Sequence, residues 1–238
     1  MLNKFVLDAD TPNFTADAVG QDVVEQANFV IGSDDANTIE ADAQGDRVEA
    51  NGGDDNVVGG TGVDTVLGGT GEDTLNGGGS DDKLLGDADN DLLLGSFDNN
   101  SNGEDTLWGG DGEDVFVGFA GDDTILAGQR NNWNGKLEDG QDVIVIDALA
   151  GNDKVWGFSQ ADDIFFINNG EEGEGFAGIA GLEIEIINGK HTLVTYQTEE
   201  GTATVNVRNE VLTEDNFTID LDDLSQSAQA AIDSVPSL

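Results

Sequence analysis

Three consecutive nine-residue segments decide the fold of this chain: GGTGVDTVL (59–67), GGTGEDTLN (68–76) and GGGSDDKLL (77–85). Six residues rich in Gly and Asp open each segment, and such residues suit a tight turn that requires positive φ angles. The remaining three residues suit a short strand whose central apolar side chain points inward. A fixed nine-residue period of this kind predicts a solenoid of turns and short strands.

The same register continues on both sides of these segments. Nine-residue units fill 32–94 and 109–126, and longer units between and after them predict loop insertions near 96–102 and 129–138. The eighth position of every unit is large and apolar, and the sixth is Asp in all units but the first. The sixth-position residues are Asn37, Asp46, Asp55, Asp64, Asp73, Asp82, Asp91, Asp105, Asp114, Asp123, Asp142 and Asp153.

The spacing of these carboxylates predicts a metal. If two units form one coil, units two apart stack on the same side, so that Asp55 lies beside Asp73 and Asp64 beside Asp82. Neighbouring carboxylates repel one another unless a cation lies between them. One inward apolar side chain per unit also offsets only part of the backbone entropy that folding removes. A shell of six to eight oxygens suits calcium, whereas magnesium needs a small octahedron and zinc prefers nitrogen or sulfur.

The three opening segments, together with GGDGEDVFV (109–117), resemble the RTX (repeat-in-toxin) family of hemolysin-type calcium-binding nonapeptides. The resemblance is strict over 50–126 and looser over 32–156. It implies an all-β fold, a right-handed parallel β-roll (a β-solenoid) that folds on binding several Ca²⁺ ions, in a bacterial protein exported by type I secretion machinery. Position by position it implies metal ligands at Asp55, Asp64, Asp73, Asp82, Asp91, Asp105, Asp114 and Asp123.

Some units depart from the family pattern. Asp142 and Asp153 follow longer gaps and are added to the candidate metal ligands. Units 32–40 and 41–49 lack the paired Gly, which predicts roll without calcium there. The unit GDADNDLLL (86–94) has lost two glycines, which counts against its backbone carbonyls as ligands.

The composition shifts at both ends of the repeat and predicts four segments. They are an N-terminal cap (1–31), the roll (32–156), a β-rich C-terminal cap (157–219) and a tail (220–238). In the C-terminal cap, alternating apolar residues before Asn188-Gly189 predict a β-hairpin. The tail predicts a short helix with Leu221, Leu224, Ala228 and Ile232 on one face, either docked on the roll or serving as an export signal.

Charge and composition exclude several kinds of protein. With 8 Lys and Arg against 50 Asp and Glu, the net charge is −42, which excludes nucleic acid as a partner and disfavours anionic membranes. Such acidity is also typical of disordered chains and of adaptation to high salt, but the repeat favours an ordered, metal-binding chain. There is no Cys, no apolar run long enough for a membrane span, and no N-terminal pattern typical of a cleaved signal peptide.

No catalytic motif is present. His191 is the only histidine, and neither H-E-x-x-H nor G-x-S-x-G occurs, so no catalytic residue is predicted and the protein is not expected to be an enzyme. We therefore expect a secreted calcium-binding protein, extracellular or at the cell surface, with a structural or matrix role. Two alternatives remain. One is a polysaccharide-binding or polysaccharide-modifying module, in which Trp108, Trp133 and Trp156 would stack on sugar rings, and the other is an adhesin fragment with a cell-surface partner.

Overall fold

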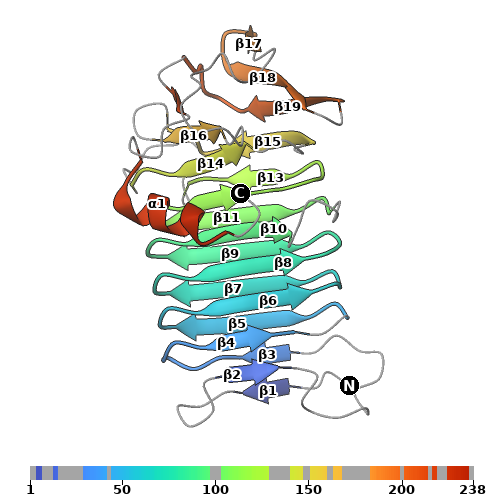
Figure 1. The fold of residues 1–238 in the computed structure, drawn as a ribbon, viewed down its shortest axis with the longest axis vertical. Helices are drawn as coiled ribbons and strands as arrows, with labels where there is room; N and C mark the ends of the chain where they lie inside the picture. The colour runs from blue at the N-terminus through green and yellow to red at the C-terminus, as the bar shows by residue number, and fades with distance from the viewer. Residues whose placement is uncertain are drawn as a thin grey trace.

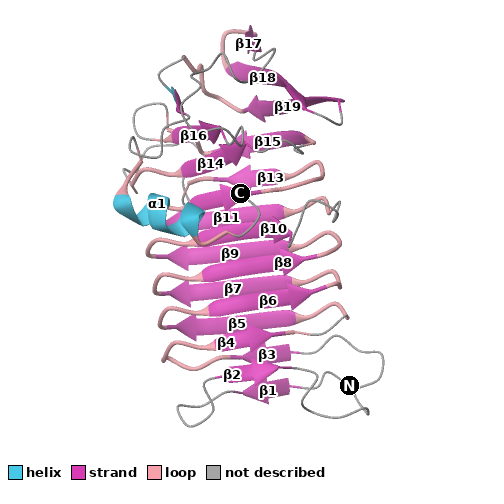
Figure 2. Cartoon of the chain, in the orientation of Figure 1, coloured by secondary structure: helices cyan, strands magenta, loops and turns pink. Residues whose placement is uncertain are grey.

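The structure is a computed structural model in which short strands stack into a roll, with one described helix (Figure 2). It describes residues 4–6, 13–15, 29–41, 44–96, 103–128, 140–146, 151–159, 163–167, 183–198, 201–213, 216–218 and 224–235. The predicted insertions (apart from Ser96), most of segment 1–31, Trp133 and Leu221 lie outside the described residues.

The described strands form two sheets, which we call sheet A and sheet B. Sheet A has the order β1 (Lys4–Val6), β3 (Phe29–Ile31), β5 (Arg47–Gly52), β7 (Thr65–Thr70), β9 (Lys83–Ala88), β11 (Thr106–Asp111), β13 (Thr124–Leu126), β15 (Asn152–Trp156), β19 (Gly201–Val207), β18 (His191–Thr198) and β17 (Glu183–Ile187). Sheet B has the order β2 (Asn13–Thr15), β4 (Thr38–Glu40), β6 (Asn56–Gly60), β8 (Thr74–Gly78), β10 (Leu92–Ser96), β12 (Val115–Val117), β14 (Val143–Ile146), β16 (Ile164–Ile167) and β20 (Phe217–Thr218).

Successive repeat units alternate between the two sheets, so that two units make one coil. Within the repeat all pairing is parallel, and each strand pairs with the strand two units later, as Thr65 does with Lys83. The register also survives the first insertion, because Lys83 pairs with Thr106 across 23 residues in the same way. The prediction of an all-β parallel β-roll is confirmed (Figure 1).

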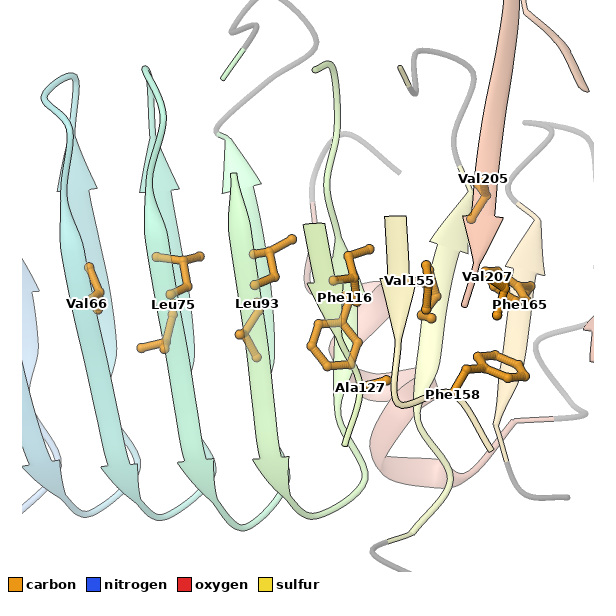
Figure 3. Close-up of a cluster of buried hydrophobic side chains, with 14 of the residues drawn as sticks. Val66, Leu75, Leu93, Phe116, Ala127, Val155, Phe158, Phe165, Val205 and Val207 are labelled. Atoms are coloured by element: carbon orange, nitrogen blue, oxygen red, sulfur yellow. The ribbon is translucent and has the colours of Figure 1, made fainter. Parts of the chain in front are cut away.

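The eighth-position side chains form the core between the two sheets (Figure 3). Val66 and Leu84 come from sheet A and Leu75 and Leu93 from sheet B, and all four are completely buried. Because strand side chains alternate, the seventh and ninth positions of each unit point outward. The inner layer is therefore one apolar row per sheet, as the repeat predicts.

The sheets extend past the limits of the repeat at both ends. β1 and β2 continue the parallel pairing within residues 1–31. At the other end β19 pairs with β15, and β17, β18 and β19 then form an antiparallel cap. The predicted hairpin is confirmed, since Asn188 and Gly189 turn with φ of 56° and 65°. Strand pairing thus crosses the predicted segment boundaries, and the division into segments stays a prediction.

The chain returns from the cap to the middle of the roll, where α1 (Gln226–Asp233) lies against the stack (Figure 1). Ser225 caps the helix by accepting the N–H of Ala228 at 3.2 Å. Ala228 and Ile232 are buried against outward apolar side chains of β10, β12 and β14. The predicted helix therefore exists and is docked on sheet B.

Candidate metal sites

The turns between strands use left-handed backbone at two fixed positions of the unit. At the second position, Gly60, Gly69 and Gly78 have φ of 112°, 124° and 105°, a region that strongly favours glycine. The unit at 86–94 has Asp87 and Asp89 at its second and fourth positions, with φ of 81° and 75°. The turn therefore keeps its conformation although two glycines are replaced, because Asp tolerates left-handed backbone better than most residues.

The sixth-position carboxylates form two hydrogen-bonded ladders, one along each side of the roll. In each rung, a sixth-position backbone N–H donates to Oδ1 of the sixth-position side chain one coil later, at 2.6–3.2 Å. The ladder beside sheet B joins Asn37, Asp55, Asp73, Asp91, Asp114, Asp142 and Asp163. The ladder beside sheet A joins Asp46, Asp64, Asp82, Asp105, Asp123 and Asp153.

The second carboxylate oxygen of these residues faces a different environment. Oδ2 is buried and accepts no hydrogen bond in Asp55, Asp73, Asp82, Asp91 and Asp105, whose side chains are at most 3% exposed. A buried anionic oxygen without a partner is costly, so these atoms are suited to bind a cation.

The first glycine of each unit lacks a side chain, and this leaves room for the sixth-position carboxylate of the same unit. A Cβ at Gly68 would lie 2.2 Å from Oδ2 of Asp73, and one at Gly86 would lie 2.1 Å from Oδ2 of Asp91. The opening Gly of the repeat is therefore explained by the close approach of the carboxylate more than by its φ angle. The unit of Asp55 is an exception, because it opens with Ala50, which is buried in the core.

Burial raises the pKa of these carboxyl groups well above the ordinary value of 3.8. Desolvation is the largest cause in each case, and the pKa is about 7 for Asp55, 6 for Asp73, 8 for Asp82, 9 for Asp91 and 7 for Asp105. Neighbouring carboxylates add to the rise, Asp114 for Asp91 among them. The backbone N–H on Oδ1 lowers the pKa but offsets the rise only in part. The ladders are thus ready to bind positive charge.

Backbone carbonyls are the other oxygens available: a Cβ at Gly68 would lie 2.2 Å from Oδ2 of Asp73 and 3.0 Å from the carbonyl oxygen of Gly86, and further carbonyls line the turns. Within the described residues, no group of three or more His, Asp or Glu side chains is placed to hold a metal ion, so side chains alone do not complete a shell there. The turn glycines pack on carbonyls of the preceding coil: a Cβ would lie 1.9 Å from the Asn51 oxygen at Gly69 and 2.5 Å from the Gly53 oxygen at Gly71. Carboxylate and carbonyl oxygens, with no nitrogen or sulfur, fit a calcium ion.

The structure places all ten predicted ligands in the two ladders. Asp55, Asp64, Asp73, Asp82, Asp91, Asp105, Asp114, Asp123, Asp142 and Asp153 are all buried, and Oδ1 of each accepts a ladder hydrogen bond. Their role as metal ligands stays a prediction. Asn37 and Asp46, which begin the ladders in the units predicted to lack calcium, are buried as well.

One further rung was missed from the sequence. Asp163 follows Asp142 in the ladder, and Phe165, two residues later, is completely buried in the core. The signal was present, since 158–166 reads FSQADDIFF with Asp at its sixth position and Phe at its eighth. Its Oδ2 accepts the N–H of Ser159 in its own turn, so Asp163 ends the ladder with both oxygens hydrogen-bonded.

Fifth-position residues form a further set of turn-to-turn hydrogen bonds along the exposed rim of the turns, and these bonds run in the opposite direction. Here the N–H of the later coil donates to the side chain of the earlier one, as Glu72 does to Asp54 at 3.0 Å and Glu104 to Asp81 at 2.9 Å. Acidic residues recur at the fifth position of the units, but the sequence alone does not predict that they bond to one another from turn to turn. These carboxylates therefore already act as turn-to-turn acceptors.

Comparison with known proteins supports the repeat assignment. The family model described as RTX calcium-binding nonapeptide repeat (4 copies) matches residues 31–66, 58–93, 67–101, 99–133 and 145–166, together just over half of the chain. Among solved structures, the extracellular lipase LipA from Serratia marcescens matches with 17% sequence identity and a TM-score of 0.34, over 84% of this chain and 41% of the lipase chain. The present chain thus spans less than half of that lipase. A comparison with curated proteins finds no match.

Proposed function

Because this chain belongs to the RTX calcium-binding nonapeptide repeat family, we propose that it is a non-enzymatic secreted protein whose roll folds when it binds calcium. It is a calcium-binding β-roll protein, since its repeats are those of the family and its fold is the roll. The observation that carries the proposal is the row of buried Oδ2 atoms without a hydrogen-bond partner, such as those of Asp73 and Asp91.

The ten predicted Asp residues are the side-chain ligands in this proposal. Several ions are held between neighbouring turns, each by carboxylates of one ladder and by carbonyls that the turn glycines leave accessible. Asp142 and Asp153 are the last such ligands along the two ladders. Asp163 is left out of the ligand set, because Ser159 already satisfies its second oxygen.

Calcium acts in this proposal as a switch between unfolded and folded chain. Without it, closing the roll at neutral pH requires burial of several carboxylates with raised pKa values, which opposes folding. An ion removes that cost, and binding free energy becomes folding free energy. Site affinities of about 10⁻⁴–10⁻³ M, as in extracellular modules, place the switch above cytosolic and below extracellular calcium.

We propose an extracellular or cell-surface location in a bacterium, reached through type I secretion machinery, and membership of the family supports this location. RTX repeats typify secreted bacterial proteins, and a chain that stays unfolded in low calcium is suited to export through a channel. No described helix is long and apolar enough to cross a membrane. We keep the tail (220–238) as the proposed export signal, which deletion of these residues without loss of export would rule out.

Circular dichroism of the full chain tests the switch. In chelator at neutral pH and low salt we expect the spectrum of an unfolded chain, and in about 10 mM calcium (roughly ten times the weakest of the affinities above) a β-sheet spectrum. Magnesium at the same concentration is the control and should restore little structure, because it keeps its water and demands a small octahedron. Full β-structure in chelator at low salt would contradict the proposal.

A further inference from the structure

The outward face of sheet B becomes apolar where α1 packs on it. On β10, β12 and β14 both outward positions of each strand are apolar, and these side chains are at most 7% exposed. On β8 the same positions hold Thr74 and Asn76, and on β6 they hold Asn56 and Val58. We call the apolar set the tail-docking face: Leu92, Leu94, Val115, Val117, Val143 and Val145.

The tail-docking face exists only in the folded roll. Its residues come from three successive coils, and the chain between them passes through both loop insertions. Parallel register places Leu92 beside Val115 and Val115 beside Val143. No single stretch of the sequence provides this face, so it is assembled when the three coils stack.

The helix depends on the face in turn. α1 has 8 residues, and an isolated helix needs about 12–15 residues to be even marginally stable in water. It has no acidic residue in its first turn and no basic residue in its last, so charge does not favour the helix either. Its apolar side is formed by Leu224, Ala228, Ile232 and Val235, which are at most 6% exposed. We therefore expect α1 to form when it docks.

A strained residue belongs to the same packed cluster. Phe119 occupies the second position of its unit with φ of 62°, where Gly69 and Gly110 stand in other units. Left-handed backbone is costly for an aromatic residue. Phe119 is 3% exposed and lies in the cluster that joins the tail-docking face to the tail. Burial of its ring there offsets the strain, which indicates that this part of the roll is shaped for the packed tail.

One polar contact joins α1 to a turn that carries a candidate ligand. Ser227 Oγ donates to Oε2 of Glu113 at 3.0 Å, and Glu113 directly precedes Asp114. A cavity of about 270 Å³ lies between the helix and the turns, and Asp73 and Asp91 are among its lining residues. The helix and the proposed ions thus act on the same coils without occupying the same space.

We propose that calcium controls the docking of α1: the tail is exposed in the calcium-free chain, and it is helical and docked once calcium has folded the coils of β10, β12 and β14. Because coupling between two binding events is reciprocal, docking of α1 raises the affinity of these coils for calcium. The inference rests on the proposed calcium-gated folding and adds a second event to it. If the tail carries the export signal, that signal is accessible in low calcium and buried after folding, which gives export a direction.

Cysteine labelling of the full chain tests the docking step, since the sequence has no cysteine. Ala228→Cys places a thiol on the buried side of α1, where the side chain is 1% exposed, and Gln226→Cys places one at an exposed position of the same helix as the control. The rate of reaction with a maleimide is measured at neutral pH in chelator and in about 10 mM calcium. Circular dichroism in the same buffers reads the fold of the roll.

We expect the labelling rate of Ala228→Cys to fall at least about a hundredfold in calcium, because only a docked tail protects the buried position. The rate of Gln226→Cys should change by less than about threefold. The calcium midpoint of folding tests the reverse effect. Ile232→Asp, which detaches the tail, should raise this midpoint at least about fivefold, whereas Gln226→Asp should leave it within about twofold.

Three results, each with an unfolded spectrum in chelator, would overturn the inference. They are protection of the Ala228→Cys thiol in chelator, a thiol that stays reactive in calcium after the roll has folded, and an unchanged calcium midpoint in Ile232→Asp. Each of them leaves calcium-gated folding intact, because circular dichroism reads folding separately. A β-sheet spectrum in chelator would instead contradict calcium-gated folding, and this inference with it.

Discussion

The backbone N–H of Asp91 donates to Oδ1 of Asp114 at 3.0 Å, while Oδ1 of Asp91 itself accepts the N–H of Asp73 at 2.9 Å. Asp91 thus connects three coils through one residue. Its remaining oxygen is buried without a hydrogen bond, and the pKa of its carboxyl is raised to about 9 by burial and by the charge of Asp114. Hydrogen bonds thus fix the position of the Asp91 carboxylate, but no partner balances its negative charge. This charge should destabilise the fold without calcium and should be needed to bind calcium when the ion is present.

Asp91→Asn is therefore expected to change stability in opposite directions in the two states. The amide keeps the Oδ1 acceptor and removes the buried charge, so less of a stabilising osmolyte such as trimethylamine N-oxide should be needed to fold the calcium-free chain. With calcium, loss of a ligand oxygen should weaken the affinity of the affected sites at least about tenfold. Osmolyte titrations in chelator and calcium titrations, both followed by circular dichroism, measure the two effects. Asp35→Asn, the same change at an exposed carboxylate in a unit predicted to lack calcium, should do neither; destabilisation of the calcium-free chain by Asp91→Asn would contradict this account.

The calcium-free roll should become more stable as the pH falls. Five ladder carboxyls have folded-state pKa values of about 6 to 9 against 3.8 unfolded, so the folded chain binds more protons between these limits. The resulting stability is complete below the unfolded pKa and is lost as the pH rises through the folded values. The osmolyte concentration that folds half of the calcium-free chain should accordingly rise between pH 5.5 and 9.5. Over the same range the calcium midpoint should move to lower concentration, since protons then compete less for the ligands. An osmolyte midpoint that falls as the pH rises would show that these groups are not buried.

Gly69→Ala should disrupt a turn. The residue has φ of 124°, and a Cβ there would lie 1.9 Å from the carbonyl oxygen of Asn51. The cost should be about 3 kcal/mol, the upper end for a strained backbone position. Gly189→Ala is the control: it also has positive φ, at 65°, but no atom lies within 4 Å of its Cβ position, so it should cost only about 1–2 kcal/mol. Thermal unfolding in calcium compares the two variants, and equal losses would mean that the packing of turn on turn contributes nothing.

Deletion of residues 97–101 should leave the fold and calcium binding unchanged. The shortened unit reads GSNGEDTLW, a regular nine-residue repeat, and the ladder bond across it already has an ordinary length, 2.7 Å from the Asp82 N–H to Oδ1 of Asp105. Shortening a surface loop changes its closure free energy by less than about 1 kcal/mol. Removal of one residue more, 96–101, breaks the repeat and should raise the calcium midpoint. If both deletions behave alike, register is not what positions Asp105.

Ile232→Asp should release α1 without unfolding the roll. Ile232 is 5% exposed and packs on the outward apolar side chains of β10, β12 and β14, whereas the eighth-position core does not contact the helix cluster. A charge there costs several kcal/mol if it stays buried, so the helix should detach. Limited proteolysis should then cleave the tail while the β-sheet spectrum in calcium is retained. Gln226→Asp, an exposed change on the same helix, should leave the tail protected; loss of the whole roll in Ile232→Asp would show that α1 is part of its core.

The repeat was enough to predict the parallel roll, its core row and the pairing of Asp55 with Asp73, because nine-residue spacing determines both the turn and the inward side chain. The Asn188-Gly189 hairpin was predictable for a similar local reason. The direction of the ladder bonds was not, since spacing does not determine which way a carboxylate turns. Asp163 was missed because its unit lacks the turn glycines. That Trp108 and Trp156 flank Leu126 in one outward row is known only once the register across the second insertion is known.

The ladders have a mechanical consequence. Through its ladders, each coil of the repeat hydrogen-bonds to the coil before it and the coil after it, in rungs of nearly equal length. A pull on the two ends of the roll therefore loads these coils in series, and they should detach one at a time, releasing about 60 Å of chain for each 18-residue coil. If the proposed ions strengthen each contact between coils, the calcium concentration would set the force at which the protein extends.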